Sequence, residues 1–156
     1  MKYKSPPFML IWAMMFFFLG CNNDDVKEAV ILQSVAYPIY DISNSNISGT
    51  ATFTQEDNGS THVLIELEGA YTSENPAYIR FNSAAEGGTV AITLKNCECA
   101  ISNTTVTHLD NGNAISYEGL VALNGHITIH GGVGYNAPIV AVADIGSNAK
   151  SSSTSP

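Results

Sequence analysis

Short apolar segments alternate along the chain with clusters of turn-forming residues, and this spacing restricts the possible fold more than any other feature. The clearest case is the pair of segments 47–54 and 61–68, which flank Asn58-Gly59. An Asn-Gly pair readily takes the positive φ angles that a tight hairpin connection demands. The two segments should therefore pair as antiparallel strands. In the second segment apolar and polar residues alternate, which is typical of a strand with one buried and one solvated face.

The rest of the chain continues this pattern of short strands. Further strands are expected at 77–82, 89–95, 104–109, 126–130 and 139–144. No segment keeps a helical period for longer than about three turns, and one short helix is expected within 115–123. We therefore predict an all-β fold, an antiparallel Greek-key sandwich or barrel of about seven or eight strands with one short helix.

The charge of the chain limits its partners. Lysine and arginine together number 6, against 14 aspartates and glutamates, and the formal net charge is −8. An acidic surface repels phosphate backbones, so nucleic acid is excluded as a partner.

The N-terminus has the layout of an export signal. Lys2 and Lys4 precede an apolar run at 8–19, which is followed by Gly20 and Cys21. The run is too short for a spanning helix, which needs about 20 apolar residues. The predicted organisation is a signal peptide at 1–20, a lipidated cysteine with a linker at 21–28, a sandwich at 29–147 and a disordered tail at 148–156.

Two short motifs here resemble those of bacterial lipoproteins. Phe18-Leu19-Gly20-Cys21 resembles a lipobox, which implies that Cys21 is acylated and becomes the first residue of the mature chain. Several acyl chains on one residue give stable membrane attachment. The acidic patch at 22–25 is similar to the surface-export signal of Bacteroidota-type lipoproteins, although a solvated spacer would look the same. We expect an envelope protein anchored to the outer membrane, on either its periplasmic or its outer face.

A second resemblance covers residues 35–147. Segments 75–88, 115–130 and 139–146 resemble CHRD-type domains, which are relatives of the copper/zinc superoxide dismutase sandwich. The resemblance implies a metal held by imidazoles from two strands. Related bacterial lipoproteins carry an H-P-A-H-I-H pattern on one strand and a V-H ending on another.

This chain departs from that ligand pattern. The matching positions hold Asn75, Tyr78 and Arg80, and only His130 remains. A guanidinium is always charged and has no lone pair to donate, and a catalytic metal usually needs three or more protein ligands. The cysteine of the dismutase-like disulfide is also replaced, within 141–143. We therefore predict no bound copper or other cofactor and no dismutase activity.

Other side chains offer alternative ligands for copper or zinc. The candidates are His126, His130, His62 and His108, with Cys97 and Cys99. His126 and His130 should share one strand face because their separation is even. Hydrogen-bonded or solvated histidines and thiols without function are the competing interpretation. The two cysteines would form a disulfide in an oxidising compartment only if a turn brought them together.

The sequence thus predicts a non-catalytic binding or structural module on the envelope, with Arg80, Tyr78 and His130 marking the surface where the family's metal would lie. The alternative is a copper- or zinc-binding or dismutase-like enzyme. The expected partners are the membrane, through the lipid on Cys21, and an unidentified envelope or extracellular protein, which would bind along an exposed strand edge in a third interpretation.

Overall fold

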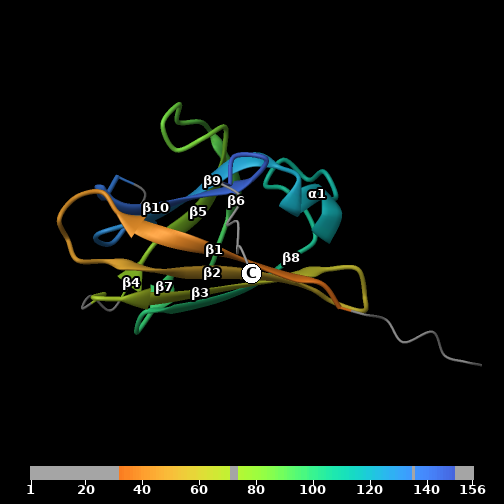
Figure 1. Cartoon of the computed structure of the whole chain (residues 1–156), viewed down its shortest axis with the longest axis horizontal. Coiled ribbons are helices and arrows are strands. Elements are labelled where there is room, and N and C mark those ends of the chain that lie inside the picture. Colours follow the sequence, from red (N-terminus) through yellow and green to blue (C-terminus); the bar gives the residue numbers. More distant parts are fainter. Residues whose placement is uncertain (1–31, 71–73, 135, 150–156) are drawn as a thin grey trace, which may run out of the picture.

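The structure is a computed structural model, and it describes residues 32–70, 74–134 and 136–149. The predicted signal peptide, Cys21 and the segment after it lie outside the described residues, as do residues 150–156. The described chain forms an antiparallel sheet that curls over on itself, with one short helix (Figure 1). This confirms the predicted all-β sandwich or barrel.

The described residues form a single run of hydrogen-bonded strands. Their bounds are β1 (Ser34–Asp41), β2 (Ser48–Gln55), β3 (Thr61–Glu68), β4 (Glu74–Asn75), β5 (Ala77–Phe81), β6 (Val90–Thr93), β7 (Cys97–Glu98), β8 (Ile101–Val106), β9 (Asn124–His130) and β10 (Ile139–Gly146). The order across the sheet is β4-β7-β8-β3-β2-β1-β10-β9-β5-β6. After β8 the chain returns through the helix to place β9 beside β5, a long return connection of the Greek-key kind.

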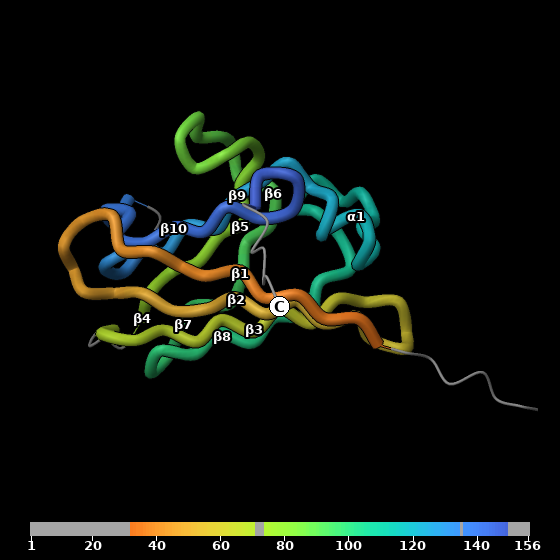
Figure 2. The backbone as a smooth tube through the Cα atoms, in the orientation of Figure 1, coloured from red at the N-terminus to blue at the C-terminus, as the bar shows by residue number. Residues whose placement is uncertain are grey.

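Curling divides the sheet into two facing layers, which Figure 2 follows along the backbone. β1, β2, β3 and β8 form the first layer, and β10, β9, β5 and β6 form the second. β1 belongs to both, because its first part pairs with β2 and its last two residues, Tyr40 and Asp41, pair with β10. The layers therefore remain one continuous sheet.

Each of the seven predicted strand segments overlaps an observed strand, with shifted ends in some cases. The hairpin between β2 and β3 forms as predicted, but only Gly59 of the Asn58-Gly59 pair has a positive φ, of +84°, and Asn58 Oδ1 instead accepts a hydrogen bond from Ser60 N at 2.9 Å. The strand predicted at 104–109 is instead β8, which starts earlier, at Ile101. β1 and the two-residue strands β4 and β7 were not individually predicted.

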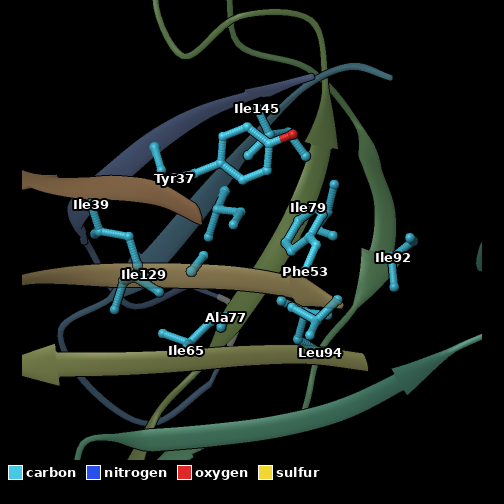
Figure 3. Packing of buried hydrophobic residues seen from close by; sticks show 14 of the residues in the cluster. Tyr37, Ile39, Phe53, Ile65, Ala77, Ile79, Ile92, Leu94, Ile129 and Ile145 are labelled. Carbon is cyan, nitrogen blue, oxygen red and sulfur yellow. The ribbon is translucent and has the colours of Figure 1, made fainter. Parts of the chain in front are cut away.

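The core fills the space between the two layers (Figure 3). Phe53 and Ile65 from the first layer and Ile79 and Ile129 from the second have no exposed surface. Phe53 meets the ring of Tyr37 edge-on, with ring centroids 5.1 Å apart. Inward side chains alternate with outward ones along each long strand, so every strand that crosses the core also presents an outer face.

The helix closes one end of this core. α1 (Tyr117–Val121) starts after Ser116, whose hydroxyl accepts a hydrogen bond from Gly119 N at 3.2 Å, as an N-cap does. Beyond the helix the chain passes close to Gly146, at the end of β10, where a Cβ would lie 2.1 Å from the carbonyl oxygen of Leu123. Only glycine fits at this position, which also has a φ of +58°.

Polar side chains join the two free sides of the curled sheet where β6 faces β8. Ser102 Oγ of β8 donates to the carbonyl oxygen of Lys95 at 2.6 Å, and Thr104 Oγ1 accepts from the backbone nitrogen of Lys95 at 3.0 Å. Asp110 covers the edge of β6 in the same way, because its carboxylate accepts from Thr93 N at 3.0 Å. These contacts replace the backbone pairing of a closed barrel.

Substituting Ser102→Ala should therefore lower the free energy of unfolding by about 1 kcal/mol, because the hydrogen bond from Ser102 Oγ to the carbonyl oxygen of Lys95 would be lost. Ser102 is 1% exposed. Urea unfolding followed by circular dichroism measures the change. Ser34→Ala is the control, since Ser34 Oγ contacts Thr54 Oγ1 on an exposed face, and it should change stability by less than about 0.5 kcal/mol. Equal losses in both variants would contradict a structural role for this junction.

Candidate functional site

Tyr78, Arg80 and His130 lie on the outer face of the second layer, and Asn75 lies beside them in β4. Tyr78 of β5 stands opposite Thr128 of β9 in the register, and Arg80 stands opposite His126. Because Ile79, Ile127 and Ile129 face the core, these polar residues point away from it. We call Asn75, Tyr78, Arg80, Thr128 and His130 the outer-face cluster. Its centre is the boundary between β5 and β9.

Arg80 is held at the centre of the outer-face cluster. Its Nε donates to Thr128 Oγ1 at 3.2 Å, and its Nη1 donates to the carbonyl oxygen of Gly88 at 3.1 Å. Its guanidinium carbon lies 5.8 Å from the ring centroid of Tyr78. The side chain thus ties β5 to β9 and to the loop that leads into β6, and it places a permanent positive charge on this face.

His130, the last residue of β9, is 2% exposed. Its Nδ1 donates to the carbonyl oxygen of Ala137 at 2.6 Å, and its ring meets that of Tyr78 edge-on, with centroids 5.2 Å apart. A carbonyl only accepts, so Nδ1 carries the proton of the neutral ring. Burial lowers the pKa of His130 and the charge of Arg80 lowers it further, whereas the bond to Ala137 acts in the opposite direction. The neutral imidazole is therefore favoured.

This pKa shift predicts a pH dependence of stability. Because the folded pKa of His130 lies below its value of 6.5 in the unfolded chain, unfolding takes up a proton as the pH falls through that region. The contribution of His130 to stability is complete above pH 6.5 and is lost as the pH falls through the folded pKa. Urea midpoints measured across this range should fall with decreasing pH in the wild type and change less in His130→Gln. A slope that His130→Gln leaves unchanged would contradict this assignment, and His62→Gln is the control.

Asn75 has a structural position within the outer-face cluster. The residue has no exposed surface, and its Nδ2 donates to the backbone carbonyl oxygen of His130 at 2.8 Å. It lies in β4, which pairs with β7 at the edge of the first layer. The amide therefore joins that edge to the end of β9.

His126 lies on the same outer face as His130, as the even spacing predicts, but it holds a different loop. Its Nδ1 donates to the carbonyl oxygen of Asn82 at 2.8 Å. Asp144 of β10 stands opposite His126 in the register, and its carboxylate accepts a hydrogen bond from Ala84 N at 2.7 Å. The two side chains together fasten the loop that follows β5. Sequence reasoning missed Asp144 because nothing in the sequence shows the register of β9 against β10.

The remaining candidate ligands are spread over other elements. His62, on β3, hydrogen-bonds Asn103 Oδ1 across the first layer. His108 Nδ1 contacts Thr107 Oγ1 at 2.9 Å in the loop after β8. Among residues 32–70, 74–134 and 136–149, no group of three or more histidine, cysteine, aspartate or glutamate side chains is arranged to share a metal ion.

Cys97 and Cys99 are both free thiols that flank the tip of the β7–β8 hairpin. Cys97 is buried, and burial raises the pKa of its thiol to about 12. Cys99 is exposed and has a φ of +49°, and Ala100 follows with a φ of +73°. The turn on which a disulfide would depend is present, but one thiol lies in the core and the other in solvent.

The outer-face cluster contains one of the two cationic side chains among the described residues. Arg80 and Lys95 are the only lysine or arginine residues in the part of the chain that the structure describes.

No helix in that same part is long and apolar enough to cross a membrane. No model of a known protein family matches the chain, and no curated protein sequence matches it either.

Proposed function

We propose that the chain is a lipid-anchored protein of the bacterial envelope, in which a CHRD-like β-sandwich serves as a non-catalytic binding or structural module. Cys21 holds it to the outer membrane, and the sandwich at 29–147 carries the function. The metal chemistry of related domains is lost in this chain.

The observation that carries the proposal is the placement of Arg80. Its guanidinium is fixed by Thr128 and Gly88 at the centre of the face where the resemblance puts a metal. Two unit charges of the same sign 4 Å apart repel by roughly 4 kcal/mol at an effective dielectric constant of about 20. A divalent copper or zinc ion would meet about twice that repulsion and would gain no ligand from the arginine.

The other members of the outer-face cluster support the same proposal. Asn75 and His130 donate hydrogen bonds to backbone carbonyls, and Thr128 accepts one from Arg80. These contacts connect β4, β5, β9 and the loop before β10. Side chains at the ligand positions thus act as structural links, which a domain needs when its former metal no longer holds these strands together.

A copper- or zinc-binding or dismutase-like enzyme is the second candidate. It is favoured by the hydrogen bond from His130 Nδ1 to a backbone carbonyl, because metal-binding histidines commonly orient their ring in this way. Superoxide consumption by the copper-loaded chain separates the two functions. Our proposal predicts the same rate for the wild type and for His130→Gln. A rate that is high in the wild type and lost in His130→Gln would favour the enzyme.

Membrane attachment has its own test. In bacteria fed radiolabelled palmitate, the wild-type chain should take up label and fractionate with the outer membrane, whereas Cys21→Ser should do neither because the acyl acceptor is gone. Cys99→Ser is the matched control, since its thiol is exposed in the folded domain. Loss of label in Cys99→Ser, or its retention in Cys21→Ser, would contradict lipidation at Cys21.

A further inference from the structure

A shallow groove lies on the outer surface beside β7 and β8. It is lined by Lys95, Asn96, Glu98, Ile101 and Asn103 and has a volume of about 210 Å³. Pockets for drug-sized ligands usually hold about 300–1,000 Å³. The groove therefore has room for a single small ring rather than for a cofactor.

Two asparagine amides in the groove each make a hydrogen bond to a neighbouring side chain. Asn103 Oδ1 hydrogen-bonds His62, which leaves the NH₂ group of Asn103 as the donor for a ligand. Asn96 is oriented in the opposite sense, because its Nδ2 donates to Glu74 Oε2 at 3.4 Å and its carbonyl oxygen remains as an acceptor. One amide thus offers donors to a ligand and the other offers an acceptor.

The other residues that line the groove add further hydrogen-bond donors and acceptors. Lys95 can only donate hydrogen bonds, and the carboxylate of Glu98 can only accept them. Ile101 is 51% exposed and provides an apolar surface among them. A sugar ring matches this set, because each hydroxyl both donates and accepts while the C–H groups of the ring pack on an apolar side chain.

The surrounding charge determines which sugars fit. Glu98 stands opposite Glu74 in the register, and Glu66 stands opposite Ile101. Lys95 is the only cation that lines the groove. The three glutamate carboxylates in and around the groove therefore repel anionic ligands.

We propose that this groove binds one neutral saccharide unit. The proposal goes beyond the function proposed above by naming a ligand class, and it rests on that function only in treating the sandwich as a binding module. The residues that line the groove do not include any member of the outer-face cluster, so a failure of saccharide binding and a discovery of bound metal are separate results.

The test is a titration of the detergent-solubilised full chain with the methyl glycosides of glucose, galactose, mannose and N-acetylglucosamine, and with glucuronate as an anionic comparison. The side-chain amide signals of Asn96 and Asn103 are followed by NMR. At least one neutral glycoside should shift both signals, with a saturable dissociation constant in the millimolar range, and glucuronate should bind more weakly.

Glu98→Gln and Asn103→Ala should each weaken that binding by about tenfold, or about 1.4 kcal/mol. The glutamine variant keeps the shape of the side chain, so it tests the groove even if Asn103→Ala disturbs the fold. The matched control is Asn113→Ala, because Asn113 is an exposed asparagine in the loop before α1 and should leave binding unchanged. The proposal is overturned if no neutral glycoside shifts the signals, if glucuronate binds more tightly, or if Glu98→Gln has no effect.

Discussion

The double substitution of Tyr78→His and Arg80→His should raise the affinity of the chain for copper on the order of a thousandfold. Both positions lie on the outer face of β5, and Tyr78 already touches the ring of His130. The variant would place three imidazoles on one face and remove the fixed cation. The gain requires both changes, because removal of the guanidinium relieves a repulsion of roughly 4 kcal/mol per unit charge, and the three imidazoles supply the ligands that hold the metal. Competition with a coloured copper chelator measures the change.

Two control variants separate the ligand effect from the charge effect. Tyr78→His alone keeps the Arg80 guanidinium and should gain little affinity. Adding His130→Gln to the double variant should remove most of the gain, because only two imidazoles would remain. The interpretation of this face as a former metal site would be contradicted if the double variant bound copper no better than the wild type while remaining folded.

Phe53→Ala should lower the free energy of unfolding by about 3–5 kcal/mol, because it leaves a cavity between the two layers. Phe53 has no exposed surface and packs edge-on against Tyr37 (Figure 3). Domains of this size are stable by about 5–15 kcal/mol, so the loss would be a large part of the total. Chemical unfolding in urea, followed by tyrosine fluorescence, gives the value.

Thr52→Ala is the matched control for this prediction. Thr52 neighbours Phe53 on β2 but faces outward, and its substitution should cost less than about 1 kcal/mol. Equal effects at the two positions would mean that the inward and outward faces of β2 are assigned wrongly.

Local sequence signals predicted the parts of the fold that depend on neighbouring residues. Asn58-Gly59 fixed the β2–β3 hairpin, and alternation identified the strands around it. β1 was not predicted because Pro38 interrupts its alternation of apolar and polar residues, and a proline usually argues against a strand. Pro38 is tolerated because it lies in the part of β1 that pairs only with β2. The two-residue strands β4 and β7 are too short to carry any period.

The candidate site was predictable in its residues but not in their contacts. Even spacing placed His126 and His130 on one face of β9, and comparison with the family pattern singled out Arg80. The partners of the two histidines are the backbone carbonyls of Asn82 and Ala137. Every residue has a backbone carbonyl, so the sequence does not indicate which one a histidine will contact. Their structural roles therefore depend on loop positions that only the fold determines.

The most direct test of the account is the copper and zinc content of the purified wild-type chain after incubation with each metal and exhaustive dialysis. With Arg80 fixed at the centre of the outer-face cluster, we expect far less than one equivalent of either metal. About one equivalent that survives dialysis and disappears in His130→Ala would contradict this prediction, because a metal site that includes His130 would then be present.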